Sequence, residues 1–207
     1  MFDVGLEWLE KRRDRMSKGL LIILSGPSGV GKGTVRKIFE KNPELNLACT
    51  TSMTTREPRE GEQEGVHYFF RTREQFQEAI KNDELLEHAE FVGNYYGTPK
   101  SEVERFLAQG KNVLLEIEVQ GAKQVQDKCP EALSIFVVPP TMEELERRIR
   151  GRASEPEEVI QERLAKAEKE LKMKSMYKYC VCNEDPELAA EIITTIILHN
   201  MKKQDCE

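Results

Sequence analysis

The chain has 207 residues, of which 39% are apolar and 33% charged, and a formal net charge of −6. This composition is typical of one compact α/β unit with room for inserted subdomains, and its apolar runs are too short for a membrane span, which needs about 18 residues. The negative charge argues against nucleic acid as the main partner, because a phosphate backbone attracts basic surfaces, so we expect any bound anion to meet a local cationic pocket.

Residues 1–18 precede the first predicted strand, and we expect an N-terminal extension there with at most one short helix. The stretch from Met1 to Arg15 has no apolar core of signal-peptide length, so the expected location is the cytoplasm. The five cysteines are odd in number and scattered, which favours free thiols over disulfides or a zinc site.

A strand buried on both faces is predicted at Leu20–Ser25, followed by a glycine-rich loop and a helix over Thr34–Lys41. The loop has the spacing of a phosphate-binding loop, in which backbone N–H groups converge on an anion: Gly26-Pro27-Ser28-Gly29-Val30-Gly31-Lys32. In the strict pattern a hydroxyl that reaches Mg²⁺ follows the lysine directly. Here Gly33 intervenes, so Thr34 is the expected contact to Mg²⁺, partly through water. The alternative is a chance glycine turn beside a surface lysine.

Residues 53–98 break the alternation of strands and helices and suggest an inserted α+β subdomain. We expect short strands at Val66–Phe70 and Glu87–Val92 and an amphipathic helix at Arg73–Lys81. Two arginines, Arg56 and Arg59, flank a proline in a polar loop. Their guanidinium groups suit a doubly charged phosphate, although a solvated loop would explain them equally well when they are taken alone.

Further buried strands are predicted at Asn112–Ile117, Leu133–Val138 and Tyr179–Val181, each followed by a helical segment. This order favours a mostly parallel sheet flanked by helices. The last helix is predicted at Glu187–His199, with a packing stripe formed by Leu188, Ile192, Ile193, Ile196 and Ile197.

Residues 141–174 are highly charged, and two capping signatures, Thr141–Glu144 and Ser154–Glu157, predict two helices joined by a hinge that could act as a lid. Arg148 and Arg152 share a face if the first helix continues through Gly151, and Arg163 lies on the second. Seen singly, arginines on charged helices are usually solvated.

Together with Asn94-Tyr95-Tyr96-Gly97-Thr98 and the stretch from Leu114 to Gly121, these motifs closely resemble the guanylate kinase family of the bacterial type, from about residue 18 to 201. The resemblance implies an α/β P-loop nucleoside monophosphate kinase fold. Its core would comprise 19–52, 99–140 and 175–201, its GMP-binding insert 53–98 and its lid 141–174. It also implies transfer of the ATP γ-phosphoryl group to GMP with Mg²⁺, by a monomer or homo-oligomer that needs no nucleic acid or membrane.

The family's pattern assigns roles to individual positions of this sequence. ATP-binding residues would be Gly26, Pro27, Ser28, Gly29, Val30, Gly31, Lys32, Gly33, Thr34 and, near the adenine ring, Asn183. GMP-binding residues would be Ser52, Arg56, Arg59, Tyr68, Glu87, Tyr96, Thr98 and Glu118. Charge compensation at the transferred group would fall to Lys32, Arg56, Arg148, Arg152 and Arg163.

Guanine chemistry is consistent with this assignment. Guanine presents N1–H and a 2-amino group beside the O6 acceptor, so carboxylates at Glu87 and Glu118 and hydroxyls at Ser52 and Thr98 would select it, since adenine would leave buried polar groups unpaired. Three alternatives stay open. Thr98 before Pro99 also suits a helix N-cap, Glu87 a solvated charge, and Asn183 a cap of the final helix. Glu116 competes with Glu118 for the contact to the base or to metal-bound water.

Three other functions compete with the kinase. A guanylate kinase-like interaction module would have lost parts of the phosphate loop or the lid arginines, whereas Gly31, Lys32 and Arg148 are present. A kinase for another nucleotide is disfavoured by the set of Ser52, Glu87 and Glu118. A regulatory GTPase would need an Asn-Lys-X-Asp motif, which the sequence lacks.

Overall fold

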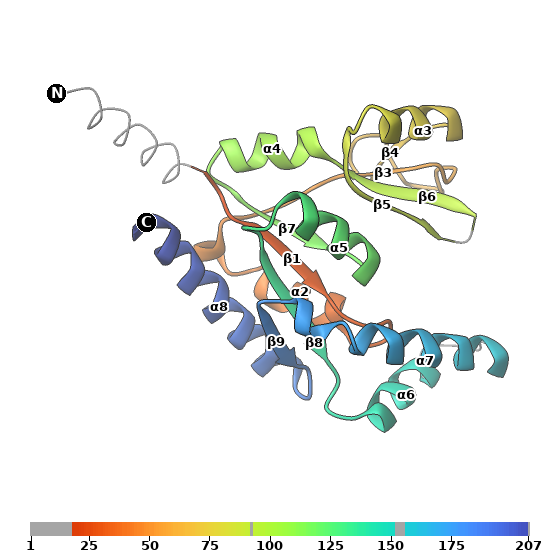
Figure 1. The fold of residues 1–207 in the computed structure, drawn as a ribbon, viewed down its shortest axis with the longest axis vertical. Coiled ribbons are helices and arrows are strands. Elements are labelled where there is room, and N and C mark those ends of the chain that lie inside the picture. Colours follow the sequence, from red (N-terminus) through yellow and green to blue (C-terminus); the bar gives the residue numbers. More distant parts are fainter. Residues whose placement is uncertain (1–17, 92, 152–155, 207) are drawn as a thin grey trace.

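A computed structural model describes residues 18–91, 93–151 and 156–206 (Figure 1). Its centre is a five-stranded sheet in the order β2-β7-β1-β8-β9, in which every neighbouring pair is parallel. The strands are β1 (Leu21–Ser25), β2 (Leu47–Cys49), β7 (Asn112–Glu116), β8 (Leu133–Val138) and β9 (Tyr179–Cys182). The expected parallel α/β core is therefore confirmed.

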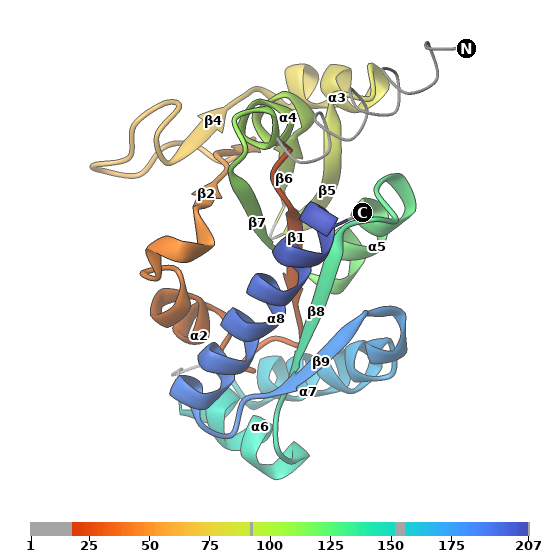
Figure 2. The same ribbon diagram turned by 90° about the vertical axis from the view of Figure 1, so that its left-hand side faces the viewer.

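Helices cover both faces of this sheet, which explains the continuous apolar run of β1. Ile22 and Leu24 pack on the side of α2 (Lys32–Phe39) and α8 (Pro186–Cys206), while Leu21 and Ile23 face α4 (Lys100–Ala108) and α5 (Val119–Lys128). Figure 2 shows α8 running across the strands on the first of these faces. Two 3₁₀ turns, η1 (Pro43–Leu45) and η2 (Lys174–Met176), complete the core. Among the described residues, none of the helices is both long and apolar enough to cross a bilayer.

The insert is a second sheet with its own small core. Its order is β4-β3-β6-β5, with β3 (Ser52–Thr54), β4 (Tyr68–Phe70), β5 (Leu85–Phe91) and β6 (Asn94–Pro99). Strand β6 is antiparallel to both β3 and β5. Helix α3 (Arg73–Lys81) starts at a capping box on Thr72 and buries Phe76 against the sheet.

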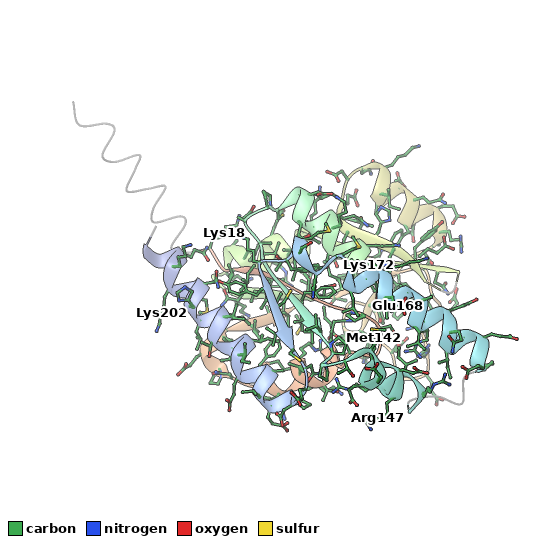
Figure 3. The ribbon with its side chains drawn as sticks, turned by 60° about the horizontal axis from the view of Figure 1, so that its bottom comes forward. Lys18, Met142, Arg147, Glu168, Lys172 and Lys202 are labelled. Atoms are coloured by element: carbon green, nitrogen blue, oxygen red, sulfur yellow. The ribbon has the colours of Figure 1, made fainter. Side chains whose placement is uncertain are left out.

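The segment predicted to be a lid, and called the lid below, contains α6 (Met142–Arg150) and α7 (Glu157–Leu171). Figure 3 shows these helices next to each other, with Met142 and Arg147 on α6, Glu168 on α7 and Lys172 just after the end of α7. Thr141 caps α6 as predicted, by accepting a hydrogen bond from the backbone of Glu144. Both helices contribute buried residues to the cluster that contains β1 and α2: Leu145, Ile149, Ile160 and Ala167. The lid therefore rests against the core through apolar packing. The predicted cap at Ser154 lies outside the described residues.

Several boundaries differ from the predictions. Helix α2 begins at Lys32, because the phosphate loop leads directly into it, and β4 begins only at Tyr68, since Val66 is 65% exposed. The stripe predicted for the last helix is partly wrong. Ile193 and Ile197 are fully buried, but Leu188 and Ile192 are 56% and 40% exposed, because they lie on the side of α8 that faces away from the sheet.

Candidate active site

The loop after β1 has backbone conformations that only glycine adopts easily. Gly29 and Gly31 have φ of 84° and 96°. A Cβ on Gly31 would lie 2.6 Å from Asn183 Nδ2, and one on Gly26 would lie 2.4 Å from the carbonyl oxygen of Val137. The loop backbone approaches its neighbours so closely that there is no room for side chains at these positions. The loop leads into α2, whose first N–H groups have no hydrogen-bond partner within the helix.

A cavity of about 290 Å³ lies against this loop at the carboxyl ends of β1 and β7, the edge where parallel α/β sheets bind ligands. Its polar lining combines Lys32 with the carboxylates of Glu116, Glu118 and Glu170. Lys32 Nζ donates to the Gly26 carbonyl at 2.6 Å. Burial lowers the pKa of Lys32, and the nearby carboxylates only partly oppose this effect. A larger cavity of about 910 Å³ lies at the opposite ends of the strands, beside Leu21 and Leu133, far from the loop.

Two of the three predicted lid arginines reach the loop. Arg148 donates from Nη1 to the Val30 carbonyl at 3.2 Å and pairs with Glu144 at 2.7 Å. Arg163 donates from Nη2 to Ser28 Oγ at 3.0 Å. The lid thus brings two guanidinium groups to the rim of the phosphate loop. Arg152 lies outside the described residues.

Asn183 holds the loop from the side of β9. Its Nδ2 donates to the Val30 carbonyl at 2.7 Å, and the residue is 2% exposed. The alternative in which Asn183 caps the last helix is wrong, because Asp185 accepts the hydrogen bond from the Leu188 backbone instead. Asn183 Oδ1 is buried and has no hydrogen-bond partner within the described part of the chain, so an acceptor remains beside the loop.

The insert contributes a buried carboxylate next to a hydroxyl. Glu87 is 7% exposed and accepts a hydrogen bond from Thr98 Oγ1 at 2.6 Å. Burial raises the pKa of Glu87, and the charge of Glu118 adds to this, while the Thr98 hydrogen bond opposes it. The two alternatives to a binding role that the sequence left open are therefore wrong. Glu87 is not a solvated charge, and Thr98 does not cap α4, because the N-cap residue of that helix is Pro99 and no side chain caps it.

Gly121 makes room for this carboxylate. It lies in the first turn of α5, and a Cβ at this position would lie 2.6 Å from Glu87 Oε2. The sequence placed Gly121 in a motif without giving it a role. The structure shows that the insert and the core approach each other here.

Glu116 and Glu118 follow each other at the end of β7 but face different partners. Glu116 pairs with Arg36 at 3.2 Å, and its Oε1 lies 3.6 Å from the Cβ position of Gly33 in the phosphate loop. Glu118 precedes α5 and pairs with Lys166 of the lid at 2.7 Å. The charge of Glu118 is also felt at Glu87. Glu116 is thus directed to the loop, and Glu118 lies between the insert and the lid.

The polar end of the insert gathers Arg56, Tyr68 and Tyr96. The Arg56 guanidinium lies over the Tyr68 ring at 5.4 Å, and the two tyrosine rings meet edge to face at 6.1 Å. Glu62, which sequence reasoning missed, accepts two hydrogen bonds from Arg56 at 2.8 and 2.9 Å and raises its pKa. Arg59 contacts the same carboxylate only through its backbone N–H, and Ser52 lies beside Tyr68 in the sheet.

A carboxylate oxygen beside a phosphate-binding loop is a ligand of the type that Mg²⁺ uses. Glu116 lines this cavity beside the loop, but among the described residues no three His, Cys, Asp or Glu side chains are grouped so that they could hold a metal ion without the nucleotide. Thr34, the contact to Mg²⁺ predicted from the sequence, is exposed and is not among the residues that line the cavity, whereas Glu116 is. Sequence reasoning missed Glu170 and Lys166, because helical charge runs of this kind carry no local signal for a site.

Comparison with known proteins agrees with this geometry. The sequence model of the guanylate kinase family matches residues 18–200. A guanylate kinase of Bacillus anthracis is 54% identical over 184 residues, which cover 89% of this chain and 90% of that protein. One from Listeria innocua is 54% identical over 180 residues, covering 87% and 88%.

The fold shows the same relationship. The crystal structure of guanylate kinase from Anaplasma phagocytophilum superposes with a TM-score of 0.67 at 35% identity, covering 89% of this chain and 87% of that one. The resemblance drawn from the motifs is thereby confirmed, and the chain belongs to the guanylate kinase family.

Proposed function

We propose that this protein is a guanylate kinase that transfers the γ-phosphoryl group of ATP directly to GMP, giving ADP and GDP, in the cytoplasmic metabolism and recycling of purine nucleotides. The observation that carries the proposal is the buried pair of Glu87 and Thr98, 2.6 Å apart, beside a carboxylate that also borders the phosphate-loop cavity. Two small anionic substrates can then be held end to end by one chain.

Guanine selection follows from the chemistry of this pair. The second oxygen of Glu87 accepts a guanine N–H, and Glu118 accepts another. The Ser52 hydroxyl is the donor for O6, and Thr98, whose hydroxyl proton is donated to Glu87, holds that carboxylate in place beside the base. Adenine offers no such pair of donors and would leave a buried carboxylate unpaired, which costs about 1–3 kcal/mol per group. Glu118 is near enough to Glu87 for its charge to raise the Glu87 pKa, whereas Glu116 pairs with Arg36 beside the phosphate loop, and this favours Glu118 over Glu116 for the base.

The GMP phosphate replaces Glu62 at Arg56. The fork of Arg56 already holds a carboxylate through two hydrogen bonds, and a phosphate presents the same acceptors with more charge. Tyr68 and Tyr96 supply hydroxyls from the two strands beside it, and Arg59 adds a second cation. Glu62 thus keeps the Arg56 guanidinium in place until the nucleotide arrives.

Phosphoryl transfer requires alignment and charge compensation rather than a protein nucleophile. Lys32 and the loop N–H groups bind the ATP phosphates, and Arg148 and Arg163 lie at the loop rim, where an arginine at the transferred group is worth about 10³–10⁵ in rate. We assign Arg152 the same role. Glu116, and Thr34 as proposed from the sequence, would hold Mg²⁺, which would neutralise charge on the phosphate oxygens. Asn183 Oδ1 is an acceptor for the adenine amino group.

The experiment uses purified protein, ATP and Mg²⁺ with GMP, AMP, dTMP or UMP in an assay that follows ADP formation. GMP should be the preferred acceptor by several orders of magnitude, and Lys32→Ala should abolish turnover. Lys37→Ala, at an exposed position of the same helix, is the matched control and should leave turnover unchanged. Equal turnover of AMP and GMP would overturn the assignment.

A further inference from the structure

Lid helix α7 carries two cations that contact opposite sides of the site. Arg163 donates to Ser28 of the phosphate loop at 3.0 Å, and Lys166, three residues later, pairs with Glu118 at 2.7 Å. Residues three apart share a face of a helix, so a single movement of α7 positions both contacts together. The residues joined by the second contact are 48 positions apart in the sequence.

Lys166 lies among carboxylates that repel one another. Its ammonium group is 2.7 Å from Glu118 and 3.8 Å from Glu170, and the charge of Glu118 acts on both Glu170 and Glu87. The hydrogen bond from Lys166 Nζ holds one oxygen of Glu118, Oε2, in place.

From this geometry we propose that Lys166 is a positioning residue that couples GMP recognition to closure of the lid over ATP. The inference rests on the proposed function. Lys166 orients Glu118 so that its other oxygen meets guanine, and a Glu118 ordered by guanine in turn holds α7, and with it Arg163, against the phosphate loop. Coupling of this kind is reciprocal: GMP raises the affinity for the adenine nucleotide by the same factor as the adenine nucleotide raises that for GMP.

The size of the effect follows from the exposure of the pair. The side chains of Lys166 and Glu118 are 45% and 53% exposed, so the ion pair is partly screened by water. Pairs of this kind change an equilibrium about two- to fivefold. A large effect on the affinity for either nucleotide alone is not expected, since Lys166 touches neither base nor phosphate in this arrangement.

The test measures GMP affinity by calorimetry, with and without saturating MgADP, which forms a non-reacting complex. The ratio of the two affinities is the coupling. Lys166→Met should reduce this ratio about two- to fivefold, and Lys166→Arg should largely restore it. Lys169→Met, at an exposed lysine of the same helix, is the control and should leave the ratio unchanged.

A double-mutant cycle with Glu118→Gln locates the partner. In the Glu118→Gln background, Lys166→Met should have no further effect on the ratio. An unchanged ratio in Lys166→Met, or an equal reduction in both backgrounds, would overturn the proposal while leaving GMP phosphorylation intact. Failure of the parent protein to phosphorylate GMP would instead refute the proposed function, and the turnover assay detects this independently.

Discussion

Replacing Glu87 by glutamine should weaken GMP binding while making the folded protein more stable. The carboxylate is 7% exposed, and its hydrogen bond comes from Thr98 at 2.6 Å. In the variant the amide oxygen keeps the Thr98 hydrogen bond, and the NH₂ group takes the place of the second oxygen. A guanine N–H then meets a donor instead of an acceptor. An unsatisfied group of this kind costs about 1–3 kcal/mol, or about 5- to 150-fold in GMP affinity.

The stability effect has the opposite sign. Burial raises the pKa of Glu87 in the folded protein, so the folded state binds a proton more tightly than the unfolded state does. The free energy of unfolding of the parent protein therefore falls as the pH rises from the unfolded pKa through the folded pKa. Glutamine carries no charge to bury, so Glu87→Gln should be more stable than the parent at pH 7, and this advantage should shrink on acidification to pH 4.

Two measurements on the same variant check this reasoning: the GMP affinity by calorimetry and the thermal midpoint at pH 4 and pH 7. Glu90→Gln, at an exposed position of the same strand, should change neither. A variant that binds GMP like the parent would remove Glu87 from the guanine site. A variant that is less stable than the parent at pH 7 would show that the carboxylate is stabilised by a partner rather than penalised by burial.

Further predictions concern the loop, the last helix and the lid. Gly31→Ala should lower ATP affinity at least about tenfold in a nucleotide titration, because φ is 96° and the new Cβ would lie 2.6 Å from Asn183 Nδ2; unaltered ATP affinity would show that the loop tolerates a side chain. In denaturant titrations, Leu188→Asn with Ile192→Asn should change the unfolding free energy by about 0.5 kcal/mol or less, whereas Ile193→Asn should lower it several times more. An equal loss in the two variants would show that Leu188 and Ile192 also belong to the buried face of the helix. Arg147 and Arg148 hold the pKa of Glu144 at about 2, and Arg150 does the same for Glu157, so their contribution to lid stability is present above pH 4.5 and is lost as the pH falls toward 2. The thermal midpoints of the parent and of Glu144→Gln, measured by circular dichroism, should therefore become equal as the pH falls toward 2. A difference in midpoint that stays constant with pH would show that these ion pairs do not stabilise the lid.

The features that could be predicted from the sequence are those that depend on residues close together in the chain. The phosphate loop, the apolar strands and the Thr141 cap each depend on neighbours within a few positions, so spacing alone identifies them. Strands β3 and β6 were not predicted, because they are short and contain polar or half-buried side chains such as Ser52 and Asn94, which are equally common in loops. Leu188 and Ile192 were assigned to the core because helical periodicity marks apolar positions without saying how wide the covered face is.

The site shows the same division. Arg148 and Arg163 were predicted from their positions in the family's pattern, and the structure places both at the phosphate loop. The contacts of Lys166 with Glu118 and of Gly121 with Glu87 join segments that are far apart in the sequence, and each depends on how two elements pack. A single sequence contains no local pattern for such pairs. Glu62 was missed because one acidic residue in a charged loop is usually solvated.

In the proposed reaction, one phosphoryl group passes directly from ATP to GMP within this site. The most direct measurement starts from ATP labelled at the γ-phosphorus, incubates it with GMP, Mg²⁺ and the protein, and separates the products. The label should appear in the β-phosphate of GDP, in amounts equal to the ADP formed, and Lys32→Ala should leave it on ATP. Release of the label as inorganic phosphate, or its transfer to AMP as readily as to GMP, would contradict the account.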